Sequence, residues 1–143
     1  MITPAQHILY VDDHQDTCDL LAYWLGRNGW QMTAVGSVAE GLRLATSAHF
    51  DLYLIDEWLP DGTGEELGNK IREFDAATPI VFYSAEVRGA IKARVLSTCA
   101  QAFVPKLGEA EELTQTIATL LEKGGAIEQR DRDAATAIHE AGS

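Results

Sequence analysis

The sequence predicts an α/β protein built on a doubly wound, five-stranded parallel sheet. Five short apolar runs alternate along the chain with segments in which apolar residues recur at the 3.6-residue period of a helix. Three of the runs are nearly continuous in apolar residues, which is typical of strands buried on both faces of a parallel sheet. Right-handed crossovers between such strands would place helices on both faces of the sheet.

Strands and helices are expected to follow one another in strict alternation. The predicted strands are residues 7–11, 30–35, 51–55, 79–83 and 101–104. Apolar residues at helical spacing lie between and after them: Leu20, Leu21, Trp24 and Leu25; Leu67, Ile71 and Phe74; Val87, Ile91 and Val95; Leu113, Ile117, Leu120 and Leu121. Each such set indicates one helix with an apolar face turned towards the sheet.

Helix boundaries are also legible in the sequence. Ser37 and Thr63 are each followed three residues later by a glutamate, which is the capping-box pattern of a helix start. Asn28-Gly29 and Lys123-Gly124-Gly125 are typical of helix ends. We therefore expect one domain over residues 1–123, then a polar tail or short extra helix over residues 124–143, and no effector domain.

Length and composition limit the functions to consider. The 143 residues suffice for one domain, and 11 basic against 22 acidic residues give a net charge of −11. Such a surface repels nucleic acid and anionic lipid, which argues against direct DNA binding. No signal-peptide pattern and no apolar run of about 20 residues is found, so we expect a cytoplasmic protein without membrane insertion. Cys18 and Cys99 fit neither a disulfide framework nor a metal motif.

Polar residues stand at the ends of four predicted strands. The first strand is followed by Asp12 and Asp13, the third by Asp56, the fourth by Ser84, and the fifth runs into Lys106. Taken singly, the first two aspartates and the serine would be helix caps, and the lysine would be solvated. Open α/β sheets, however, bind ligands at the carboxyl edge of their strands. The five residues together therefore predict one shared site.

The chemistry of these groups indicates phosphoryl transfer. Three carboxylates in one crevice favour a hard divalent cation, and Mg²⁺ fits best because it takes one or two carboxylates and keeps several waters. The Ser84 hydroxyl and the Lys106 ammonium would bind an anion that sits on the metal. Asp56 is the expected nucleophile, because it ends the central strand and precedes the turn at Pro60-Asp61-Gly62.

With these motifs the chain resembles the receiver domain of bacterial two-component response regulators, of the single-domain chemotaxis type, over residues 6 to about 123. The resemblance implies a flavodoxin-like strand order of 2-1-3-4-5. It also implies the following roles: Asp12, Asp13, Asp56 and the backbone carbonyl of Trp58 hold Mg²⁺; Asp56 is the phosphoacceptor; Ser84 and Lys106 bind phosphoryl oxygens; and Phe103 is the aromatic switch residue.

The same resemblance implies how the protein would work. It would accept a phosphoryl group from a histidine kinase or a histidine phosphotransfer protein, and would signal through protein contacts. It would not be an enzyme beyond its own phosphotransfer and dephosphorylation. The face made by the fourth helix, fifth strand and fifth helix is where a homodimer would form.

Three departures from the family pattern bear on the site. Pro105-Lys106-Leu107 replaces the usual Lys-Pro pair, Trp58 is large where smaller or polar residues are common, and Ser84 replaces a threonine. Trp58 and Glu86 lie two residues after Asp56 and Ser84, respectively, and are expected to flank the water that hydrolyses the aspartyl phosphate. The four histidines share no metal-ligand spacing and are expected in surface or capping positions, and Glu57 is expected to be solvated.

Three other functions compete with a phosphoacceptor. A pseudo-receiver would have the fold and work without phosphorylation, and the displaced proline keeps this alternative open. A phosphatase of the dehalogenase type needs a second acid two residues after the nucleophile, where this chain has Trp58. A flavodoxin needs a loop rich in serine and threonine after the first strand, where this chain has the acidic stretch 12–16.

Overall fold

Five parallel strands form the central sheet, in the order β2-β1-β3-β6-β7. The computed structural model describes residues 5–85 and 88–123. Its five sheet strands are β1 (His7–Val11), β2 (Gln31–Val35), β3 (Leu52–Ile55), β6 (Ile80–Ser84) and β7 (Ala102–Pro105). Since β6 and β7 are the fourth and fifth strands of this sheet, the predicted order 2-1-3-4-5 is confirmed. The short strands β4 (Trp58–Leu59) and β5 (Gly62–Thr63) form an antiparallel hairpin that the sequence reading did not include.

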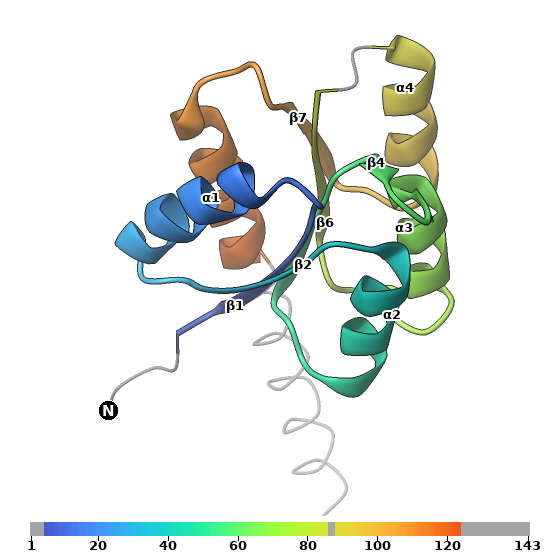
Figure 1. Ribbon diagram of the computed structural model, residues 1–143, viewed down its shortest axis with the longest axis horizontal. Helices are drawn as coiled ribbons and strands as arrows, with labels where there is room; N and C mark the ends of the chain where they lie inside the picture. Colours follow the sequence, from blue (N-terminus) through green and yellow to red (C-terminus); the bar gives the residue numbers. More distant parts are fainter. Residues whose placement is uncertain (1–4, 86–87, 124–143) are drawn as a thin grey trace, which may run out of the picture.

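Helices cover both faces of the sheet, as predicted (Figure 1). They are α1 (Gln15–Arg27), α2 (Val38–Ser47), α3 (Gly64–Arg72), α4 (Gly89–Thr98) and a last helix over residues 110–123. Side chains of α2, α3 and α4 share one apolar core with Leu9 and Val11 of β1. Those of α1 and the last helix share the other core with Ile8 and Tyr10. The two cores thus follow the alternation of side chains along a strand.

The predicted helix boundaries agree with the structure wherever it describes them. The side chain of Ser37 accepts a hydrogen bond from the backbone of Glu40, and that of Thr63 accepts one from Glu66. Helix α1 ends before Gly29, whose φ of 82° is a conformation that glycine adopts readily. Val87, the end predicted at Lys123-Gly124-Gly125 and the predicted tail at 124–143 reach outside the described residues.

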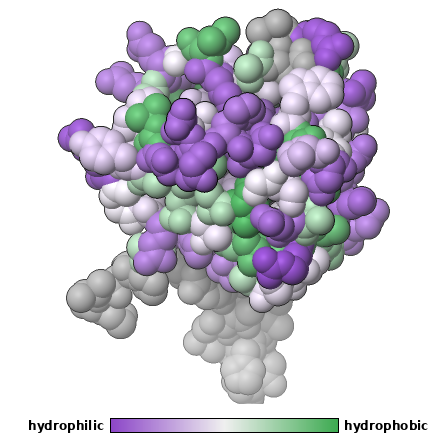
Figure 2. Space-filling model, viewed as in Figure 1, coloured by the Kyte–Doolittle hydropathy of each residue, from purple (hydrophilic) through white to green (hydrophobic). Residues whose placement is uncertain are grey.

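Not every residue of the predicted apolar stripes is buried. Leu21 and Leu25 of α1 are fully buried, but Leu20 is 47% exposed, and Phe74, just after α3, is 48% exposed. Figure 2 shows one face of the molecule, where hydrophilic residues predominate and apolar side chains form small separate patches. None of the helices in the described ranges is long and apolar enough to cross a membrane.

One arginine fastens the amino-terminal edge of the sheet. Arg72, at the end of α3, donates hydrogen bonds to three backbone carbonyls and one side-chain amide. The acceptors are the carbonyls of Cys99 (2.9 Å), Asp75 (2.9 Å) and Thr78 (2.8 Å), and Oε1 of Gln101 (2.8 Å). Because these residues precede β6 and β7, a single guanidinium joins the end of α3 to the starts of both strands.

The opposite edge depends on a close approach of two backbone segments. The β4–β5 hairpin returns the chain so that Gly64, the first residue of α3, packs against the end of β3, and its N–H donates to the carbonyl of Glu57 (2.8 Å). A Cβ at position 64 would collide with the carbonyl oxygen of Asp56 and lie 2.8 Å from Cγ2 of Ile55. A residue without a side chain is therefore required where α3 meets the carboxyl end of β3.

We predict that Gly64→Ala lowers the free energy of unfolding by roughly 1–3 kcal/mol, because the added methyl overlaps backbone and a buried isoleucine. Urea denaturation of the purified protein measures this difference. The control is Gly26→Ala in α1, where a Cβ would meet nothing within 4 Å; helix propensity should then raise the free energy of unfolding by up to about 1 kcal/mol. Equal urea midpoints for Gly64→Ala and wild type would contradict the close approach.

Candidate functional site

The polar residues predicted at the strand ends meet at the carboxyl-terminal edge of the sheet. Asp12 follows β1, Asp56 follows β3, Ser84 is the last residue of β6, and Lys106 follows β7. Asp12 (2% exposed), Asp56 (3%) and Ser84 (0%) are buried polar residues, and Lys106 is partly buried. Asp13 lies beside them but is exposed. The five residues are thus brought together, with three of them removed from water.

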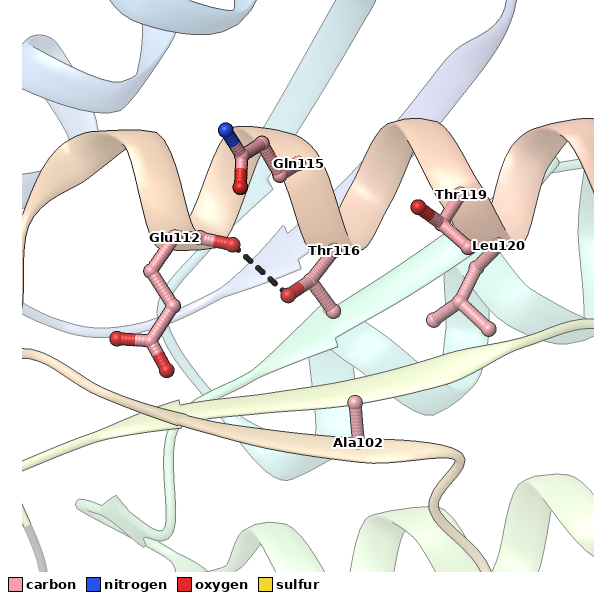
Figure 3. Close-up of a pocket in the computed structure, with 6 residues that line it drawn as sticks. All are labelled: Ala102, Glu112, Gln115, Thr116, Thr119 and Leu120. Atoms are coloured by element: carbon pink, nitrogen blue, oxygen red, sulfur yellow. Dashed lines mark hydrogen bonds between the residues drawn. The ribbon is translucent and has the colours of Figure 1, made fainter.

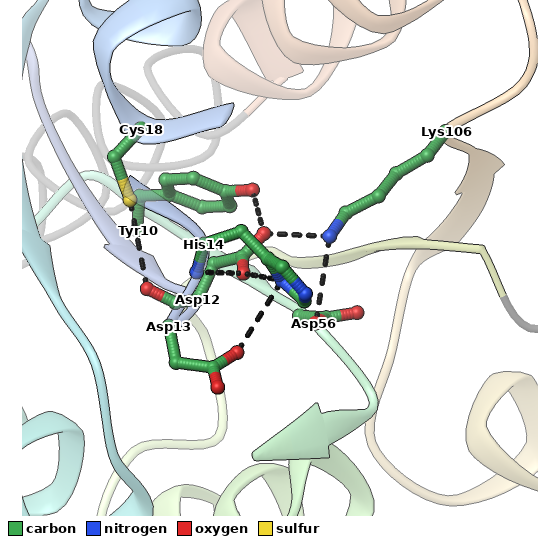
Figure 4. A network of polar contacts seen from close by, with 7 residues as sticks. All are labelled: Tyr10, Asp12, Asp13, His14, Cys18, Asp56 and Lys106. Atoms are coloured by element: carbon green, nitrogen blue, oxygen red, sulfur yellow. Dashed lines mark hydrogen bonds and ion pairs between the residues drawn. The ribbon is translucent and has the colours of Figure 1, made fainter. Parts of the chain in front are cut away.

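Both oxygens of the Asp12 carboxylate are engaged (Figure 4). Lys106 donates to Oδ2 through Nζ (2.6 Å), and the hydroxyl of buried Tyr10 donates to the same atom. The backbone N–H of His14 donates to Oδ1 (2.9 Å), and the ring atom Nδ1 of His14 lies 2.8 Å from it. Burial alone would raise the pKa of Asp12, but these hydrogen bonds outweigh burial and hold the pKa below its ordinary value. Asp12 is therefore present as a carboxylate.

Fewer contacts offset the burial of Asp56 than offset that of Asp12, and its contact with Lys106 is the longer one. Nζ of Lys106 lies 3.4 Å from its Oδ2, and the side chain of Ser84 hydrogen-bonds to it. Burial raises the pKa of Asp56, Lys106 opposes that rise, and the negative charge of Asp12 adds to it. One lysine ammonium is thus shared by two buried carboxylates, and a further cation at this edge would stabilise the ionised form of Asp56.

The acidic groups present a donor set that fits a magnesium ion. Asp12, Asp13, His14 and Asp56 each offer one ligand atom, and these atoms all lie within 4.8 Å of one another. Mg²⁺ binds through one or two carboxylates and retains waters, which the open side of the cluster at Asp13 allows. The residues that would hold the ion are therefore the acids at the ends of β1 and β3.

Lys106 reaches the site although leucine, and not proline, follows it. Its backbone N–H donates to the carbonyl of Ser84 (2.9 Å), which continues the contact between β6 and β7 beyond the last strand residue. No cis peptide bond occurs in the described part of the chain. The strand contact therefore carries the lysine to the edge of the sheet without the family's Lys-Pro pair.

Two further predicted residues lie around this edge. Trp58 begins β4, is 49% exposed, and has the guanidinium of Arg88 5.6 Å from its ring centroid. Phe103 of β7 is partly buried and stacks on Phe82 of β6, with ring centroids 6.3 Å apart. Glu86 lies outside the residues that the structure describes.

Two residues of the site were not predicted from the sequence. Tyr10 was assigned to an ordinary strand, yet its hydroxyl contacts Asp12; alternation along β1 places both on one face of the sheet and was the available signal. His14 was expected in a surface or capping position, and it is indeed the exposed N-cap residue of α1. Its ring, however, also lies 3.3 Å from Oδ1 of Asp13, so it belongs to the acidic cluster.

The expectation that Glu57 is solvated is wrong. Its exposure is 2%, and its side chain lies against the start of α3. Oε1 accepts a hydrogen bond from the backbone N–H of Glu65 (3.4 Å), and Oε2 has no hydrogen-bond partner among the described residues. Burial raises the pKa of Glu57 to about 7. Glu57, next to Asp56 in the sequence, is thus a third buried carboxyl group at this end of the sheet.

The fold and this cluster of acids, lysine and serine define a receiver domain, the signalling module of two-component systems. The family model of the response regulator receiver domain matches residues 8–118, so the chain belongs to that family. Receiver domains are signalling domains that interact with histidine kinases and phosphotransfer proteins.

Curated relatives and solved structures agree with this assignment. The chain is 34% identical to protein PetR of Rhodobacter capsulatus over 86% of its own length and 52% of that protein. It is 31% identical to the transcriptional regulatory protein YkoG of Bacillus subtilis, over 83% of the chain and 52% of YkoG. The chain therefore spans about half the length of these relatives.

Among solved structures, a CheY-like receiver domain of Methanospirillum hungatei superposes with a TM-score of 0.82 at 24% identity, over 86% of this chain and 98% of that one. The response regulator TrrA of Thermotoga maritima, in complex with Mg(2+)-BeF, gives a TM-score of 0.74 at 24% identity, over 80% of this chain and 98% of TrrA. These likenesses establish the shared fold.

We predict that Glu57 makes the stability of the protein depend on pH. Its pKa is raised above the ordinary value of 4.5, so the folded state binds this proton more tightly than the unfolded state does. The resulting stabilisation is fully present below about pH 4.5 and is lost as the pH rises through about 7. Between pH 5 and 8, wild type should therefore lose on the order of 3 kcal/mol relative to Glu57→Gln.

Urea denaturation at a series of pH values, with EDTA present, measures this difference. The exposed Glu109 supplies the control, since Glu109→Gln should have the same pH dependence as wild type. If the curves of wild type and Glu57→Gln run parallel, Glu57 keeps the same pKa in the folded and unfolded states and the prediction fails.

Proposed function

We propose that this receiver domain accepts a phosphoryl group on Asp56, in the presence of Mg²⁺, from a histidine kinase or a histidine phosphotransfer protein. The observation that carries the proposal is the buried Asp56 carboxylate, which contacts Lys106 and Ser84 and lies near the acids that follow β1. The contacts of this carboxylate offset its burial only in part, and two hydrogen-bond donors lie next to it. Such a group is suited to attack phosphorus and to bear a phosphoryl group.

Each neighbouring residue has a distinct role in the proposal. Lys106 and Ser84 would donate hydrogen bonds to phosphoryl oxygens and so stabilise the charge that develops on them during transfer. Mg²⁺, when bound, would neutralise further negative charge on the transferred group.

The proposed ligands of the ion are the carboxylates of Asp13 and Asp56 and the backbone carbonyl of Trp58. Asp12 would act mainly through water, because hydrogen bonds already occupy both of its oxygens.

We predict that a small phosphodonor with Mg²⁺ adds the mass of one phosphoryl group to wild type, as measured by mass spectrometry of the intact protein. Asp56→Asn should abolish the adduct, because the amide is a poor nucleophile. Asp19→Asn, an exposed change on α1, should leave it intact. Failure of wild type to form any adduct while it remains folded would favour the pseudo-receiver, a binding module that works without phosphorylation.

The lifetime of the phosphorylated form would depend on the residues that flank the attacking water. Hydrolysis needs a water in line with the phosphorus, opposite the Asp56 oxygen. Trp58, two residues on, has a bulky indole that cannot act as a base, and the guanidinium of Arg88 lies 5.6 Å from its ring centroid. Glu86 would orient the water from the position two residues after Ser84. We propose that steric hindrance by Trp58 dominates and slows hydrolysis.

Trp58→Asn should therefore dephosphorylate several-fold faster than wild type, since a barrier lower by about 1.4 kcal/mol raises the rate tenfold. Phosphorylation by a small donor should change much less. Mass spectrometry that follows the loss of the adduct over time gives the rate. The control is Tyr23→Asn, which removes a different exposed aromatic residue, on α1. An unchanged or slower rate in Trp58→Asn would mean that the indole serves packing or partner binding.

Output would run through the face made by α4, β7 and the last helix. We propose that phosphorylation shifts an existing equilibrium in which Ser84 moves towards the phosphoryl group and Phe103 fills the vacated space. The stacking of Phe103 on Phe82, in the strand that ends in Ser84, would link the two movements.

If this switch operates, a phosphoryl mimic should change the NMR chemical shifts of residues near Asp56 and also those of residues 88–107. Phe103→Leu should shorten the affected range, whereas Phe74→Leu, at an exposed aromatic, should not. Shifts confined to the neighbourhood of Asp56 in wild type would contradict the switch.

The partner surface includes a hollow of about 300 Å³ between β7 and the last helix (Figure 3). Ala102, Glu112, Gln115, Thr116, Thr119 and Leu120 line it. Its mixture of apolar groups, hydroxyls and a carboxylate suits a protein contact, and we propose it as the place where a homodimer forms. Light scattering with and without the phosphodonor measures the molecular mass of the protein in solution.

The two free buried cysteines are consistent with a protein that functions in the reducing cytoplasm.

A further inference from the structure

We propose that His14 is a direct ligand of the divalent ion through Nδ1, and that this site therefore favours imidazole-binding ions such as Co²⁺ over Mg²⁺. The inference rests on the proposed function, because it concerns the same acidic cluster. It goes beyond that function by adding a nitrogen ligand to a site otherwise made of oxygens, and so by naming the class of ion that the site prefers.

The distances around the His14 ring fit a shared ion. Nδ1 lies 2.8 Å from Oδ1 of Asp12 and 3.3 Å from Oδ1 of Asp13. A metal ion lies about 2.1 Å from carboxylate oxygen or imidazole nitrogen, so ligand atoms at right angles around it are about 3 Å apart. Nδ1 and Oδ1 of Asp13 therefore already have the spacing of neighbouring ligands, with the carboxylate of Asp12 beside them. One ligand atom of Asp56 lies within 4.8 Å of one ligand atom each of Asp12, Asp13 and His14.

The backbone of His14 favours this ring position. His14 is the N-cap residue of α1, with extended φ and ψ of −90° and 104°, and among the described contacts its side chain makes no capping hydrogen bond to the helix. The ring instead turns back over the carboxylates, as Figure 4 shows, while 64% of the side chain remains exposed. An incoming ion would therefore meet the imidazole at the open side of the site.

The other described histidines lack such surroundings. Nε2 of His7 contacts the hydroxyl of Thr33 (2.6 Å), and Nε2 of His49 lies 3.3 Å from a single carboxylate, that of Asp51. Neither belongs to a described group of three or more ligand residues. His49 is consequently a matched control: it is an exposed histidine next to one aspartate, outside the cluster.

Ligand chemistry determines the expected selectivity. Imidazole suits Co²⁺, Ni²⁺ and Zn²⁺, whereas Mg²⁺ prefers oxygen donors and gains little from a nitrogen ligand. Removal of the His14 ring should therefore weaken Co²⁺ binding strongly and Mg²⁺ binding little. If the ring only holds Asp12 in place by a hydrogen bond, its removal would change the affinities for both ions by the same factor.

Calorimetric titration of the metal-free full chain with Co²⁺ and, separately, with Mg²⁺ tests the proposal. We expect wild type to bind Co²⁺ more tightly than Mg²⁺. His14→Ala should lose about tenfold or more in Co²⁺ affinity but less than about threefold in Mg²⁺ affinity. His49→Ala should match wild type for both ions. The visible absorption of bound Co²⁺ should also differ between wild type and His14→Ala, because a nitrogen ligand is lost.

The outcomes separate this inference from the proposed function. If Mg²⁺ binds wild type but not Asp56→Asn, while His14→Ala leaves the ratio of Co²⁺ to Mg²⁺ affinity unchanged, the acidic site stands and the role of His14 is overturned. If wild type binds neither ion, both the inference and the metal dependence of the proposed function are overturned.

Discussion

The ion pair between Lys106 and the two buried aspartates is the interaction on which the site depends. Asp12 and Asp56 end neighbouring parallel strands, so the sheet itself forces their carboxylates together. Two such charges away from water would repel each other strongly without a counter-charge. Lys106 provides it from the end of β7, at 2.6 Å and 3.4 Å, and thereby joins β1, β3 and the far strand of the sheet.

That one lysine serves two carboxylates explains the unequal states of the two aspartates. Asp12 has the shorter contact, together with the hydroxyl of Tyr10 and the backbone of His14, and its pKa lies below the ordinary value. Asp56 has the longer contact, and burial raises its pKa. A divalent ion would remove this imbalance, which is the physical reason to expect metal dependence in a site of this composition.

The sheet, and the meeting of Asp12, Asp13, Asp56, Ser84 and Lys106 at its carboxyl edge, could be predicted from the sequence because both follow from backbone topology. Continuous apolar runs mark buried parallel strands, and the carboxyl ends of such strands meet at one edge whatever the details of packing. For Tyr10, alternation along the strand was a usable signal, but His14 and Glu57 could not be assigned in this way, because their contacts depend on where side chains point after folding. Glu57 is the clearest example: a charged residue after a strand is usually solvated, but this one is buried against the start of α3, where the backbone N–H of Glu65 donates to its side chain.

The two ends of the sheet are held together by different contacts, and Arg72 provides those at the amino-terminal end. At the amino-terminal end, four hydrogen bonds from one guanidinium join α3 to the starts of β6 and β7. Any sliding of β7 along β6 would have to break several of them at once, at a cost of about 1 kcal/mol or more for each. At the other end, the backbone N–H of Lys106 holds β7 to β6 through the carbonyl of Ser84, and the Lys106 ion pairs hold it to the acids that follow β1 and β3. None of the four Arg72 bonds involves a residue of the site, so a change of charge at Asp56 would act on the contacts at one end of β7 and leave those at the other end in place.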